Sequence, residues 1–153
     1  MDCSREIEMR LEQVMPLIKE HLALGQNVRF GPQGTSMLPM LRQGRDKVVL
    51  SPVKGPLKKY DLPLYQRDNG AFVLHRIVRA GETYTCIGDN QYTLEHGIRQ
   101  DQIIAVVSAF TRDDREIPVT DLGYRIYCRL WCGLRPVKRG CGKIKRLLFG
   151  TKM

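Results

Sequence analysis

The sequence contains no long apolar segment, which limits the places where the chain can work. No apolar run among its 153 residues approaches the roughly 20 residues that a membrane-spanning helix needs. The first residues are charged and amphipathic, which is not typical of a secretory signal peptide. We therefore expect the chain to stay on the cytoplasmic side of the membrane, with no transmembrane segment of its own.

Cysteines are few, odd in number and irregularly spaced, which argues against a metal centre. Cys128 and Cys132 would share one face of a helix, but neither a histidine nor a second close pair accompanies them. A zinc site needs three or four ligands. Reduced thiols, buried or at an interface, are the better interpretation. We expect neither a metal nor a cofactor.

Acidic residues are nearly absent from the C-terminal part of the chain. Residues 121–153 hold nine Lys or Arg residues and one Asp, a net charge of +8 against +9 for the whole chain. Aromatic, leucine and arginine side chains mixed in this way suit a peripheral contact with an anionic membrane surface. They equally suit a helix packed on the domain with one basic face outward. Nucleic acid is a weaker candidate partner, because no recognition motif accompanies the charge.

The rest of the composition is typical of one globular domain, with 42% hydrophobic and 27% charged residues. The period of the apolar residues predicts an amphipathic helix over 4–24, kinked or made less regular at Pro16 and ended by Gly25. A second helix is expected to begin after Asp121 as N-cap and to end at Pro136. Short apolar runs between these helices predict strands over 27–30, 46–51, 61–66, 72–79, 83–87, 103–110 and 116–119.

Particular residues make the strand prediction more specific. Pro63 cannot donate to a β-ladder, which favours an edge position for the strand over 61–66. Asn69-Gly70 predicts a hairpin turn after that strand. His75 lies near the middle of the strand over 72–79, so Arg76 should point to the opposite face and have a structural role.

The stretch over residues 34–41 differs from an ordinary core strand. Gly34 and Pro39 bracket Ser36 within an apolar run, and a tightly turned segment of this kind can present a hydroxyl to a groove. A serine needs a nearby base to act as a nucleophile. The plainer interpretation of Ser36 is a loop hydroxyl.

His75 is the candidate base, because a polar ring within a strand-like run needs a hydrogen-bond partner. The turn Gly88-Asp89-Asn90-Gln91 supplies a carboxylate that could orient the imidazole. A nucleophile, a base and an orienting acid would then be present. A structural strand histidine is the plainer interpretation of His75.

Three motifs in this order resemble those of the S24/S26 serine peptidases, which include the type I signal peptidases and the LexA-type self-cleaving repressors. The motifs are Gly34-x-Ser36-Met37-x-Pro39, His75-Arg76-Ile77 and Gly88-Asp89-Asn90, and the resemblance covers roughly residues 28–110. Histidine at the second motif resembles the endoplasmic-reticulum and archaeal signal peptidases, whereas the bacterial type uses lysine. The resemblance implies a mainly β, LexA/signal peptidase-like β-sheet peptidase domain over 26–120. An N-terminal helix over 1–25 and a basic helical tail over 121–153 would flank it.

The resemblance also implies an activity: a serine endopeptidase of signal peptidase type, which cleaves an extended peptide or preprotein after small residues in signal or leader peptide processing. Ser36 and His75 would form the catalytic dyad. The residues expected to line the substrate groove are Met37 and Pro39, although core packing explains Met37 equally well.

The family usually places an aspartate shortly after its Gly-Asp-Asn motif, where this chain has Glu95. The acid that orients His75 is therefore Asp89 or Glu95. The alternative function is a catalytically inactive S24/S26-like module that binds a peptide or senses a signal. A LexA-type repressor is disfavoured, because no helix-turn-helix segment precedes the motifs.

Overall fold

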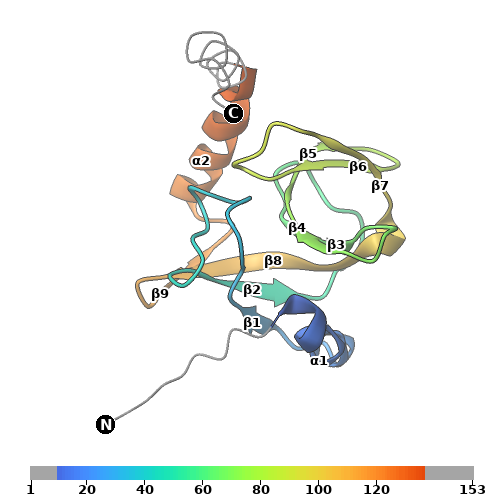
Figure 1. Cartoon of the computed structure of the whole chain (residues 1–153). Helices are drawn as coiled ribbons and strands as arrows, with labels where there is room; N and C mark the ends of the chain where they lie inside the picture. Colours follow the sequence, from blue (N-terminus) through green and yellow to red (C-terminus); the bar gives the residue numbers. More distant parts are fainter. Residues whose placement is uncertain (1–9, 137–153) are drawn as a thin grey trace, which may run out of the picture.

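A computed structural model describes residues 10–136, in which two antiparallel sheets are combined with a helix at each end (Figure 1). The prediction of a mainly β chain with an N-terminal and a C-terminal helix is confirmed. None of the described helices has the length and apolar character needed to cross a bilayer. The elements are α1 (Leu11–Ala23), β1 (Val28–Phe30), β2 (Lys47–Ser51), β3 (Pro63–Gln66), β4 (Phe72–Leu74), β5 (Arg76–Ala80), β6 (Tyr84–Ile87), β7 (Glu95–Ile98), the 3-10 helix η1 (Gln100–Gln102), β8 (Ile103–Arg112), β9 (Arg115–Pro118) and α2 (Leu122–Gly133).

The larger sheet is built around β8, the longest strand. Its strands follow the order β1-β2-β8-β3-β4, and β9 also pairs with β8. The first half of β8 pairs with β3 and its second half with β2, so Ala105 lies opposite Leu64 and Val107 opposite Leu50. The smaller sheet is the meander β5-β6-β7, which lies over the β3–β4 end of the larger sheet (Figure 1).

Helix α1 covers the larger sheet through its apolar stripe. Met15, Ile18 and Leu22 are buried in the main core, and fully burying a side chain of this kind contributes roughly 1.5–3 kcal/mol. Gly25 ends the helix as predicted: with φ +75° its N–H donates to the Leu22 carbonyl, and the next N–H donates to the His21 carbonyl. The helix continues through Pro16, and residues 4–9 of the predicted helix lie outside the described residues.

Two strand predictions are wrong. The strand over 72–79 is divided into β4 and β5, which belong to different sheets, and His75 lies at the junction between them. Pro63 does not mark an edge, because β3 pairs with both β4 and β8. It is the first residue of its strand, a position where the missing N–H is tolerated. The hairpin turn at Asn69-Gly70 is confirmed, with Gly70 at φ +88° between β3 and β4.

Helix α2 begins as predicted, because the Asp121 carboxylate accepts a hydrogen bond of 2.9 Å from the Tyr124 N–H. It ends at Gly133, three residues before the predicted end at Pro136. Tyr124 and Cys128 of this helix are buried against the domain. The remainder of the predicted basic tail, residues 137–153, lies outside the described residues.

Candidate active site

Ser36 lies in an irregular loop between β1 and β2 and is held there by the turn that follows β6. The Asn90 N–H donates to the Ser36 carbonyl oxygen over 2.8 Å, and the Asn90 side-chain amide donates to the Thr35 carbonyl oxygen over 3.1 Å. A Cβ atom at Gly88 would lie 2.5 Å from the Ser36 carbonyl oxygen, so only glycine permits this approach. The Gly88-Asp89-Asn90 turn therefore fixes the backbone of Ser36.

His75 is buried at the point where the chain passes from one sheet to the other. Its Nδ1 lies 3.1 Å from Glu95 Oε1 and 3.4 Å from the Tyr65 hydroxyl. An ionised carboxylate only accepts hydrogen bonds, so contact with Glu95 favours the proton on Nδ1. Nε2 then keeps the lone pair that a general base needs.

Glu95 is held in turn by Arg67. The Arg67 guanidinium contacts both carboxylate oxygens, with Nε 2.9 Å from Oε2 and Nη2 on Oε1. Burial raises the pKa of Glu95, but hydrogen bonds from Arg67 and Tyr65 outweigh burial and keep the pKa below its usual value. Glu95 is therefore ionised at neutral pH and available to His75.

The histidine itself favours its neutral form. Burial lowers the pKa of His75 most strongly and Arg67 lowers it further, whereas Glu95 raises it; the net result is a pKa below the ordinary value. A neutral imidazole at pH 7 can accept a proton, which is the state required of a general base.

Ser36 and His75 line the same cavity of about 320 Å³, which we call the serine–histidine cavity. Within the described residues 10–136, no hydrogen bond joins the Ser36 hydroxyl to the His75 ring. Such bonds are often absent without substrate, so the shared cavity is the more informative observation. The other lining residues include apolar side chains from α1, β1 and β4, together with Arg67 and Gln91.

The two candidate acids have different partners. Glu95 contacts His75, whereas Asp89 forms a two-point ion pair with Arg76, both of its oxygens lying 2.8 Å from guanidinium nitrogens. Arg76 and the Asp89 carboxylate are almost completely removed from solvent. Burial lowers the pKa of Arg76, but Asp89 outweighs this effect and keeps it well above the usual value. This geometry favours Glu95 as the orienting acid and gives Asp89 the task of holding its turn.

The predicted groove residues occupy unlike positions. Met37 is buried in the main core and also lines the serine–histidine cavity, a position that fits either interpretation. Pro39 is exposed and is not among the residues that line this cavity. The sequence did not point to Tyr65 or Arg67. Tyr65 contacts His75, which is 10 positions away, and Arg67 contacts Glu95, which is 28 positions away, so neither contact produces a local sequence pattern.

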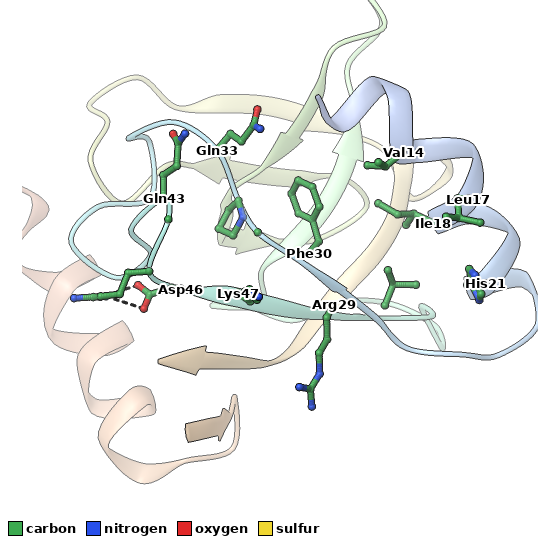
Figure 2. Close-up of a pocket in the computed structure, with 15 residues that line it drawn as sticks. Val14, Leu17, Ile18, His21, Arg29, Phe30, Gln33, Gln43, Asp46 and Lys47 are labelled. Atoms are coloured by element: carbon green, nitrogen blue, oxygen red, sulfur yellow. Dashed lines mark hydrogen bonds and ion pairs between the residues drawn. The ribbon is translucent and has the colours of Figure 1, made fainter. Parts of the chain in front are cut away.

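A second hollow of about 410 Å³, which we call the α1 groove, is drawn in Figure 2. It lies between α1, β1 and the loops before and after the serine turn. Figure 2 shows Val14 and Ile18 of α1 beside Phe30 of β1, with polar side chains such as Gln33 and Lys47 along the other side. Residues 30, 32 and 33 line both hollows, so the two lie next to each other beside β1.

No group of three or more His, Cys, Asp or Glu side chains in the described part of the chain could hold a metal ion. Cys86 and Cys128 are buried free thiols, and Cys132 is partly buried. Burial raises the pKa of Cys86 to about 12, so this thiol is not reactive at neutral pH.

Comparison with known proteins gives no match: no family model, curated protein or solved structure is similar to this chain.

Proposed function

We propose that this chain is a serine endopeptidase of signal peptidase type, with a LexA/signal peptidase-like fold and a Ser36–His75 dyad. The observation that carries the proposal is that both side chains line one cavity while Glu95 contacts Nδ1 of the His75 ring. The S24/S26-like motifs support the same assignment.

The proposed reaction begins when Ser36 Oγ attacks a peptide carbonyl carbon and its proton passes to His75 Nε2. The charged imidazole is stabilised by Glu95, which Arg67 keeps in place. Backbone N–H groups of the serine turn would meet the oxyanion. The C–N bond then breaks as His75 returns the proton to the leaving amine, and water hydrolyses the acyl-enzyme by the same proton route.

The substrate would be an extended peptide with small residues before the cut, as in signal or leader peptide processing. In the described larger sheet β1 pairs with β2 alone, so its other edge can accept a further strand. Residues 30, 32 and 33, which line both the α1 groove and the serine–histidine cavity, would guide the peptide from this edge to Ser36. A cytoplasmic-side location with peripheral attachment to a membrane is part of the proposal.

Cleavage of a peptide library, read by mass spectrometry, tests this function. The wild type should cut after small residues, and Ser36→Ala and His75→Gln should lose these cuts. Ser51→Ala, whose hydroxyl bonds to Ser108 within the larger sheet, and His96→Gln, at an exposed position, are matched controls that should retain them. Cuts that persist in Ser36→Ala would refute the proposal.

A catalytically inactive peptide-binding or sensing module is the second candidate. The specific observation in its favour is that no hydrogen bond joins Ser36 to His75 within residues 10–136. This candidate predicts that the folded wild type binds peptides without cutting them, and that Ser36→Ala binds them equally well.

A further inference from the structure

Helix α2 has two unlike faces, and its inner face is tied to the candidate active site. The Tyr127 hydroxyl donates to Asp89 Oδ2 over 3.0 Å, and Trp131 Nε1 donates to the Asp89 carbonyl oxygen over 2.9 Å. Tyr124 and Cys128 on the same face contact the buried Arg76. These contacts fix the rotation of α2 about its axis, so its opposite face points away from the domain.

The outer face carries large aliphatic side chains. Their exposed fractions are 69% for Leu122, 48% for Ile126, 59% for Leu130 and 50% for Leu134. Side chains four residues apart lie on the same side of an α-helix, so three residues of α2 and its C-cap Leu134 form a single slanted row, which we call the α2 stripe. A helix of a globular domain normally buries one apolar stripe and turns polar residues outward, whereas α2 is apolar on both sides.

The charge around the α2 stripe is of one sign. Arg125 and Arg129 are exposed and lie along one edge of the stripe, each one residue before a stripe residue. From Leu122 to its last residue the sequence contains nine Lys or Arg residues and no Asp or Glu. An apolar row edged by cations matches a bilayer with anionic headgroups, where aliphatic groups enter the acyl boundary and guanidinium groups meet phosphates. A nucleic acid would match the charge but leave the leucines in water.

We propose that the α2 stripe is the surface by which this protein docks on an anionic membrane, with the α2 axis lying in the plane of the headgroups. The Asp89 turn joins the inner face of α2 to the loop that carries Ser36. Docking would therefore give the serine–histidine cavity one fixed orientation relative to the membrane. This surface rests on the peripheral membrane attachment included in the proposed function and specifies how it is made, and docking would occur whether or not Ser36 is catalytic.

Flotation of the full-length chain with vesicles tests the inference. The protein should float with vesicles of phosphatidylcholine and phosphatidylglycerol, but much less with phosphatidylcholine alone, and salt should weaken the binding. Ile126→Gln/Leu130→Gln should weaken binding by about tenfold to a hundredfold, because two half-exposed aliphatic groups no longer enter the bilayer. The matched control Leu17→Gln/Leu24→Gln removes two leucines of α1 that are 56% and 69% exposed and should bind as the wild type does.

Two results would overturn the inference. Equal flotation of the wild type and Ile126→Gln/Leu130→Gln would mean that basic residues alone make the contact. Absence of flotation in the wild type would refute membrane docking. If the wild type were then found to be a dimer in solution and Ile126→Gln/Leu130→Gln a monomer, the partner of the α2 stripe would be a second copy of the chain. Cleavage of soluble peptides without vesicles should be unchanged in this double variant, and Ser36→Ala should still float, so this test and the peptidase test fail independently.

Discussion

Replacing Asp89 with asparagine should strongly destabilise the domain, because it would leave Arg76 as an unpaired charge in the interior. The Arg76 side chain has no exposed surface, and the Asp89 side chain is 2% exposed. Asparagine keeps the shape of the side chain but not its negative charge. Removing one partner of a buried ion pair costs about 3–5 kcal/mol, since the other charge remains desolvated.

The free energy of unfolding should therefore fall by about 3 kcal/mol or more, and the melting temperature by about 10 °C. Urea unfolding can be followed by the fluorescence of Trp131, the single tryptophan, which itself donates to the Asp89 carbonyl oxygen. Glu116→Gln is the matched control: its ion pair with Arg29 is 49% and 66% exposed, so its loss should change stability by about 0.5 kcal/mol or less.

Adding Arg76→Met to the Asp89→Asn variant should recover part of the lost stability, because the unpaired charge is then gone. A stability of Asp89→Asn within about 1 kcal/mol of the wild type would refute this reasoning, since it would mean that the guanidinium finds another counter-charge or water. A large effect in Glu116→Gln would equally contradict it.

The remaining predictions concern Glu95, which contacts His75, and Gly88, which lies against the backbone of Ser36. Since burial lowers the pKa of His75 and Glu95 raises it, Glu95→Gln should move the acid limb of the kcat/KM profile to lower pH. The same variant should reduce kcat/KM by roughly 10²-fold or more, and a limb displaced to higher pH would contradict the assignment. Gly88→Ala should cost about 1–3 kcal/mol and abolish cleavage, because its Cβ would meet the Ser36 carbonyl oxygen at 2.5 Å. Thermal melts should show Gly81→Ala, with its nearest atom at 3.8 Å, close to the wild type.

Predictions from the sequence succeeded where the residues that form a feature are close together in the chain. Gly25 ends α1 through bonds to the preceding turn, Gly70 completes a hairpin, and Asp121 caps α2 through an N–H three residues ahead. In each case one residue type supplies the backbone angle or hydrogen bond that the local structure requires.

Predictions that assumed a regular strand failed where contacts with residues distant in the sequence determined the course of the backbone. The run over 72–79 has the composition of one strand, but Arg76 pairs with Asp89 in the interior and His75 contacts Glu95, and the chain passes from β4 to β5, in the other sheet, at His75. The missing N–H of Pro63 predicts an edge strand, but at the start of β3 this missing donor is tolerated in a strand that is paired on both sides.

The sequence by itself determined the mainly β class with its terminal helices, the end of α1 at Gly25, the Asp121 N-cap of α2, and the candidate set of Ser36, His75, Asp89 and Glu95. Only the tertiary structure separated the two carboxylates, because nothing local distinguishes an acid that will meet a histidine from one that will meet a buried arginine. Burial made the difference: Arg76 has no exposed surface and takes Asp89 as its counter-ion, which leaves Glu95, held by Arg67, for His75.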